Sequence, residues 1–149
     1  MKKPAMLKKI YFAFLFLMLS QVITAQTLDF KNKNASNSQE RTMMLDIFRA
    51  NLYQEYQQEF VFVVKHFKVG GNFAWLEAEA QRKDGKPIKF DGDEPHDCCF
   101  ATALFKKSNG KWYLVESGAF GTDVWWAGVR SRHRAAPRDI FPGGNEYDE

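Results

Sequence analysis

Cysteine and histidine are scarce in this chain. Its 149 residues include two cysteines, which are adjacent, and three histidines. Two cysteines are too few for a disulfide scaffold, so the packing of apolar side chains must hold the fold together. A structural zinc site usually needs four nitrogen or sulfur ligands, and the sequence has no second cysteine pair to complete one. We therefore expect no metal site and no cofactor.

A long apolar span is also lacking. Four lysines within the first nine residues precede the unbroken apolar run Ile10–Leu19, and a mostly polar stretch then leads to Ala25. The run has 10 residues, well below the ~18 or more that cross a bilayer. This order is typical of a secretory signal peptide. We expect cleavage after Ala25, and therefore a secreted or periplasmic protein.

No strong charge of one sign remains after this segment. Residues 26–149 carry 17 basic and 18 acidic side chains, a net charge of −1. Nucleic-acid binding needs a concentrated positive surface, which this composition does not favour. We expect no nucleic-acid partner and no membrane association once the signal is removed. The expected partner is a protein or a small ligand that the sequence does not identify.

Apolar spacing predicts one helix near the start of the domain. Residues 26–37 are polar and aperiodic, which indicates a flexible leader before a single domain at 38–149. Apolar residues then recur every three or four positions, as on one face of a helix. We predict a helix from Ser38 to about Gln57. Its buried stripe comprises Met44, Leu45, Phe48, Leu52 and Tyr56.

The apolar period then changes to two, which predicts strands. The stretches "EFVFVVKHF", "FAWLEAEAQR", "CCFATALFKK" and "KWYLVESG" are separated by turn residues, and "PIKF" is a candidate edge strand. In the second stretch Ala74, Leu76, Ala78 and Ala80 share one face, opposite Trp75. A short helix is predicted in "DVWWAGVRSRHR". The fold class is α+β: an N-terminal helix packed on a four-stranded, curved antiparallel sheet, with a short C-terminal helix.

Several motifs resemble those of a known group of proteins. The stretches "RTMMLDIFR", "FVVKHFKVGGNFAWLEA", "KWYLVESGAFGTDVWW" and "APRDIFP" resemble a group of small, uncharacterised secreted bacterial proteins. The resemblance covers roughly residues 41–142 and implies a cystatin-like or NTF2-like fold. It brings no established activity, and a fold of this kind leaves the function open.

The stretch "DEPHDCCF" allows several interpretations. Successive side chains of a strand point to opposite faces, which favours Cys98 and Cys99 as two structural thiols and disfavours a shared metal. Adjacent trans Cα atoms lie ~3.8 Å apart, below the usual ~4.4–6.8 Å of a disulfide. A vicinal disulfide therefore requires the backbone to turn there. The third alternative is a reactive thiol with His96 as its base.

The acidic residues have simple structural explanations. Asp91, Asp93 and Asp97 could ligate calcium, but a solvated loop explains them equally well. Glu77 and Glu79 could act as paired carboxylates, although a solvated sheet face is the simpler interpretation.

Glu116 and the aromatic residues that follow it are the candidate binding residues. Glu116 is expected to share a face with Trp112 and Leu114 and to pair with a cation such as Lys65 or Arg130.

Trp125 and Trp126 lie ~100° apart if they are helical, so that one packs inward and the other faces a groove. Together with Arg130 they are typical of binding hot spots, although both tryptophans could simply seal the helix against the sheet.

The sequence supports three hypotheses about function. The first is a secreted or periplasmic, non-enzymatic binding or accessory domain that uses Trp125, Trp126, Arg130 and Glu116. The second is a small enzyme that uses Cys98 or Cys99 with His96, or Glu116 in an NTF2-like cavity. The third is an inhibitory or structural module. We assign no catalytic residue from the sequence.

Overall fold

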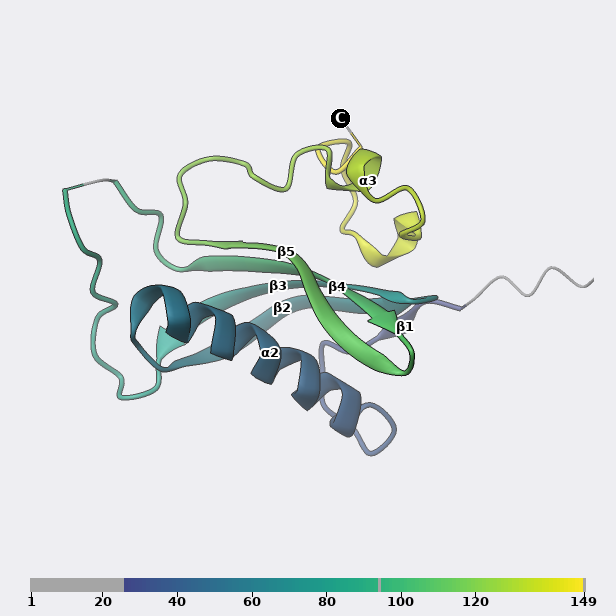
Figure 1. Ribbon diagram of the computed structural model, residues 1–149, viewed down its shortest axis with the longest axis horizontal. Coiled ribbons are helices and arrows are strands. Elements are labelled where there is room, and N and C mark those ends of the chain that lie inside the picture. The colour runs from purple at the N-terminus through teal and green to yellow at the C-terminus, as the bar shows by residue number, and fades with distance from the viewer. Residues whose placement is uncertain (1–25, 94, 149) are drawn as a thin grey trace, which may run out of the picture.

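One long helix packs on an antiparallel sheet, and a short C-terminal helix lies on the other side (Figure 1). We describe residues 26–93 and 95–148 of a computed structural model. The expected signal peptide, residues 1–25, lies outside the described residues. The elements are β1 (Leu28–Asp29), α2 (Ser38–Tyr56), β2 (Phe60–Gly70), β3 (Phe73–Arg82), β4 (Phe100–Ser108), β5 (Lys111–Ala119), α3 (Val129–Arg132) and the 3-10 helix η1 (Arg138–Ile140).

Helix α2 forms where the apolar period predicts it. It spans Ser38–Tyr56, and Met44, Leu45, Phe48 and Leu52 are buried on one stripe. Asn34 stabilises the turn before the helix. Its side-chain oxygen accepts hydrogen bonds from the backbone N–H groups of Ser36 and Asn37. The N-cap residue, Asn37, makes no side-chain capping hydrogen bond. The N–H of Ser38 donates to the backbone oxygen of Asn34 at 3.0 Å.

The sheet is a simple antiparallel meander in the order β1-β2-β3-β4-β5. Asn109 and Gly110 have φ values of 50° and 76°, as the two-residue turn between β4 and β5 requires. The sheet has five strands rather than the predicted four, because Leu28–Asp29 pairs with β2. Phe30 of the same leader is buried, so this part of the leader belongs to the domain.

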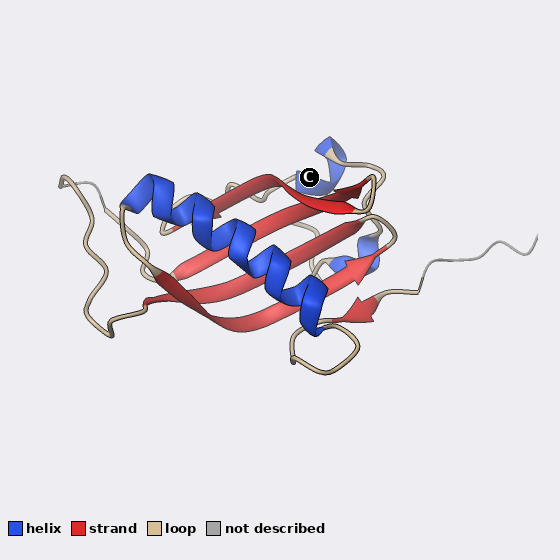
Figure 2. Cartoon of the chain, turned by 60° about the horizontal axis from the view of Figure 1, so that its bottom comes forward, coloured by secondary structure: helices blue, strands red, loops and turns tan. Residues whose placement is uncertain are grey.

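Both faces of the sheet carry a core. The alanine side of β3, with Leu76, is buried in the core that α2 covers (Figure 2). Trp75, on the opposite side of β3, is fully buried beneath the C-terminal segment. We call this opposite side the second face. Its core comprises Phe73, Trp75, Leu104, Val129, Ala136, Ile140, Phe141 and Tyr147.

Two predicted elements differ from the structure. The stretch Pro87–Phe90 is not a strand and belongs to the long connection between β3 and β4. The predicted second helix is a single turn, Val129–Arg132, and Trp125 and Trp126 precede it in a loop. Side chains of the second face anchor this loop, so packing overrides local helix propensity there. Within the described part of the chain, no helix is both long and apolar enough to cross a membrane.

The buried stripe of α2 yields a test of the architecture. Leu52 is 1% exposed, so we expect Leu52→Ala to lower the free energy of unfolding by ~2–5 kcal/mol, the usual cost of truncating a buried leucine. Met43 of the same helix is 42% exposed, and Met43→Ala should cost no more than ~0.5 kcal/mol. Urea titration of both variants measures the difference. Equal losses would contradict the packing of α2 on the sheet.

Candidate functional site

A β-bulge determines where Glu116 points. Leu104 pairs with Glu116 and Phe105 pairs with Leu114, which leaves Val115 as an extra residue in β5. An extra residue reverses the alternation of side chains beyond it. Glu116 therefore lies on the second face with Leu104, and the expectation that it shares a face with Trp112 and Leu114 is wrong. Those two residues pack in the core beneath α2.

Glu116 forms a three-residue cluster with the segment after α3. Its carboxylate accepts a hydrogen bond from Arg132 Nε at 3.0 Å and lies 2.6 Å from His133 Nε2. The expected partners, Lys65 and Arg130, pair with other carboxylates. Arg132 also donates to the backbone oxygens of Trp125 and Ala127. The cluster therefore holds the loop that carries Trp125 and Trp126, here called the tryptophan loop, against β5.

Trp125 and Trp126 pack against the sheet. Trp125 lies 5.9 Å from the ring of Trp75, and a Cβ atom at position 118 would stand 2.4 Å from Trp125 Nε1, so Gly118 is required there. Trp126 contacts the ring of Phe100 edge-on at 5.1 Å. Both tryptophans are half-buried, which makes them a seal with exposed edges rather than the walls of an open groove.

Arg130 takes part in a second cluster. Asp148 accepts hydrogen bonds from Arg130 and Arg138, one to each carboxylate oxygen. The hydrogen bond from Arg130, together with that from Arg138, holds the pKa of Asp148 below its ordinary value despite partial burial. Arg138 also donates to the backbone oxygen of Gly144. Two arginines thus converge on the last part of the described chain.

The short segment Asn145–Asp148 lies on the second face much as a bound peptide would. The backbone N–H groups of Gly128 and Arg130 donate to the oxygens of Glu146 and Tyr147 at 2.9 and 2.8 Å. The ring of Tyr147 contacts Trp75 at 5.8 Å between ring centroids.

The hydroxyl of Tyr147 donates to Glu77 Oε1 at 2.7 Å. Trp75 Nε1 donates to the same oxygen at 3.0 Å. Burial, followed by the hydrogen bond to Glu77, raises the pKa of Tyr147. Glu77 is therefore not a solvated carboxylate, as the sequence suggested, but the hydrogen-bond acceptor for two buried aromatic side chains.

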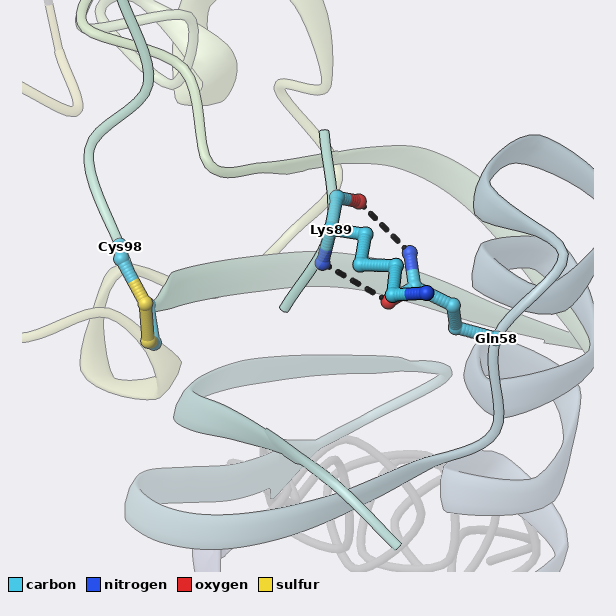
Figure 3. Close-up of a disulfide and its surroundings, with 4 residues drawn as sticks. Gln58, Lys89 and Cys98 are labelled. Carbon is cyan, nitrogen blue, oxygen red and sulfur yellow. Dashed lines mark hydrogen bonds between the residues drawn. A yellow bond between two sulfur atoms is a disulfide. The ribbon is translucent and has the colours of Figure 1, made fainter. Parts of the chain in front are cut away.

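The adjacent cysteines form a disulfide across a cis peptide bond (Figure 3). The structure thus selects one of the three alternatives that the sequence left open. Cys98 is exposed, whereas Cys99 is half-buried against the core under α2. Because both sulfur atoms are in the bridge, neither is a nucleophilic thiolate in this state.

Hydrogen bonds hold the connection that carries the disulfide to the rest of the domain. The side chain of Gln58 exchanges two hydrogen bonds with the backbone of Lys89, at 2.7 and 2.9 Å (Figure 3). The backbone N–H of Asp97 donates to the oxygen of Phe120 at 2.9 Å. His96 stacks on Phe90 at 4.0 Å between ring centroids, so its ring serves packing.

The other candidate sites have less support. Among the residues that the structure describes, no group of three or more His, Cys, Asp or Glu side chains is placed to hold a metal ion. Asp91, Asp93 and Asp97 are exposed. An open pocket of about 430 Å³ is lined by Tyr53, Gln57, Gln58, Glu59, Arg82, Lys83 and Asp84. Its charges pair with each other, Arg82 with Asp84 and Lys83 with Glu59.

The chain matches no family model, and comparison with curated proteins and with solved structures gave no significant match. Sequence reasoning named Trp125, Trp126, Arg130 and Glu116 as candidate binding residues, and the structure brings all four to the second face. Sequence reasoning missed four further residues of this region: Glu77, Arg138, Tyr147 and Asp148.

The arginine pair on Asp148 predicts a pH dependence of stability. A carboxylate with a lowered folded pKa stabilises the fold above its unfolded pKa of ~3.9, and this contribution is lost as the pH falls through the folded value. We expect Asp148→Asn to lower the urea midpoint at pH 7 and the difference from the parent protein to vanish in acid. Asp139→Asn, at an exposed position, should show no such trend. A difference that does not depend on pH would contradict the role of the ion pairs.

Proposed function

We propose that this protein is a secreted or periplasmic, non-enzymatic binding domain whose recognition surface is the second face of the sheet. The proposed ligand is an acidic peptide segment that contains tyrosine. The observation that carries the proposal is the segment Asn145–Asp148, which already occupies this face through contacts that a separate peptide could make.

Three kinds of contact support recognition of a peptide. The backbone N–H groups of Gly128 and Arg130 donate to backbone oxygens of the segment. Such hydrogen bonds do not depend on the sequence of the ligand. The aromatic cluster of Trp75 and Phe141 beside Glu77 selects a tyrosine, because its hydroxyl meets a carboxylate acceptor. The arginine pair that holds Asp148 selects an acidic residue directly after it. Buried aromatic anchors and arginine–carboxylate pairs are common at binding hot spots.

The same geometry favours binding over catalysis. Glu116 and His133 are within hydrogen-bonding distance, as a general base and its orienting carboxylate would be. Arg132 occupies the other oxygen of Glu116 and ties the pair to the tryptophan loop, so the cluster has a clear structural role. The alternative that uses a cysteine nucleophile requires prior reduction of the disulfide.

The fold and the disulfide support the remaining parts of the proposal. A helix that lies across an antiparallel meander favours the cystatin-like or NTF2-like class, whose members include binding modules, inhibitors and a few enzymes. Disulfides persist in oxidising compartments and are rare in the cytosol, so the Cys98–Cys99 bridge supports export.

The proposed ligand class can be tested by weakening the hold of Asn145–Asp148 on the second face, so that a separate peptide can bind there. In the full mature chain, Tyr147→Ala combined with Asp148→Ala removes the aromatic anchor and the paired carboxylate. We expect this variant to bind a labelled peptide with the sequence of residues 145–149, with a Kd below ~1 mM, by fluorescence anisotropy. The parent protein should bind at least tenfold more weakly, because a tethered segment competes at an effective concentration in the millimolar range.

Two controls make the result decisive. The same peptide with alanine in place of tyrosine should not bind, and Arg130→Gln in the double variant should weaken binding about tenfold. Circular dichroism and urea titration show whether the double variant folds, and Asp148→Ala alone provides a milder alternative. A folded variant that binds neither peptide, or binds both equally, would contradict the proposal.

Export provides a separate test. Expression of the full chain in a bacterial host should give protein outside the cytoplasm whose first residue is Gln26, as read by N-terminal sequencing. Recovery of an uncut chain in the inner membrane would show that residues 1–25 act as an anchor instead.

A further inference from the structure

Most of strand β2 has an open edge. On its outer side β1 pairs only with Lys68 and Val69, and Phe30 donates its N–H to the oxygen of Phe67. Among the described residues, no strand covers the outer side of Phe60–His66 (Figure 2). The outward-facing backbone groups of this stretch are therefore available for pairing with another strand.

The open edge is unusually apolar. Val61 and Val63 are 39% and 42% exposed and lie on the second face, where they pair with Gln81 and Glu79. Soluble proteins usually protect edges with charges, proline or bulges. Here the protection comes only at the end of the stretch, where Lys65 is the extra residue of a bulge. Residues 60–64, which precede Lys65, are all valine or phenylalanine, and no strand of the described chain pairs with their outer edge.

We propose that β2 pairs antiparallel with β2 of a second copy of this chain, about a two-fold axis at Phe62. In this register Val61 lies opposite Val63 of the second copy, and Glu59 lies opposite Lys65 of the second copy. Each pair occurs twice in the dimer. The two sheets join into one continuous sheet, and the exposed valines form apolar cross-strand pairs.

The pairing of Glu59 with Lys65 and the length of the open part of β2 select this register. An axis at Val63 would put Lys65 opposite Val61 and Glu59 opposite Phe67, where β1 already begins to pair. An axis at Val61 would put Glu59 opposite Val63. Only the axis at Phe62 pairs the two charges with each other and keeps the ladder inside the open stretch.

The self-complementary pattern identifies the partner as a second copy. A two-fold interface requires that one surface carry both halves of every contact. The stretch 59–65 does so, with an acidic residue at one end, a basic residue at the other and valines between. Glu59 and Lys65 now pair with Lys83 and Glu79, but all four side chains are 45–65% exposed. Exposed pairs of this kind contribute little and exchange readily.

Charge reversal tests the register by sedimentation equilibrium of the mature protein at low salt. We expect a monomer–dimer equilibrium in the parent protein. Glu59→Lys alone and Lys65→Glu alone should each raise the dimer dissociation constant by about tenfold or more. Glu59→Lys combined with Lys65→Glu should restore it to near the parent value, because the opposite charges then meet again across the axis.

The double reversal separates the dimer from effects within one copy. Within a copy it places a second cation beside Lys83 and a second carboxylate beside Glu79, so intramolecular effects alone would make the double variant the worst of the three. Val63→Lys should abolish the dimer, and Val115→Lys, at an exposed position on β5, should leave it intact. A monomeric parent protein at millimolar concentration, or a double variant as weak as the singles, would overturn the proposal.

Discussion

The burial of strand β3 on both faces is the constraint on which the rest of the structure depends. One side of β3 carries alanines and Leu76, which are buried in the core that α2 covers. The other side carries Trp75, which is fully buried and must be covered. The C-terminal segment exists as a layer because it covers this tryptophan, with Phe141 and Tyr147 packed on its ring. The candidate recognition surface is therefore built on a requirement of the core.

Polar groups on the second face are placed by backbone irregularities as much as by sequence alternation. The bulge at Val115 turns Glu116 toward Arg132, and Gly118 leaves the space that Trp125 fills. The bulge at Lys65 comes where the open part of β2 gives way to the stretch that β1 covers. Bulges are common at sheet edges and functional sites, where they redirect a side chain or end a pairing.

The sequence predicted the parts of the fold that follow from periodicity. The helix bounds, the stripe around Phe48 and the alanine face of β3 are confirmed. It did not predict β1, because two residues are too short for an alternation to show, nor the single turn of α3, because tertiary contacts determine its length. Glu116 was assigned to the wrong face since a bulge leaves no local signal. Tyr147 was missed because its role depends on Glu77, which is distant in sequence.

The proposed peptide surface is the second face and the proposed dimer contact is the open edge of β2, and their combination has a geometric consequence. Residues directly opposite in an antiparallel pair point to the same face, so pairing at the β2 edge would place both α2 helices on one side and both second faces on the other. A dimer of this kind would present two tyrosine-binding sites in a fixed relative orientation. A ligand with two acidic tyrosine segments would then bind the second site intramolecularly, at an effective concentration set by the spacer. Dimerisation would thus strengthen peptide recognition without any new contact to the peptide.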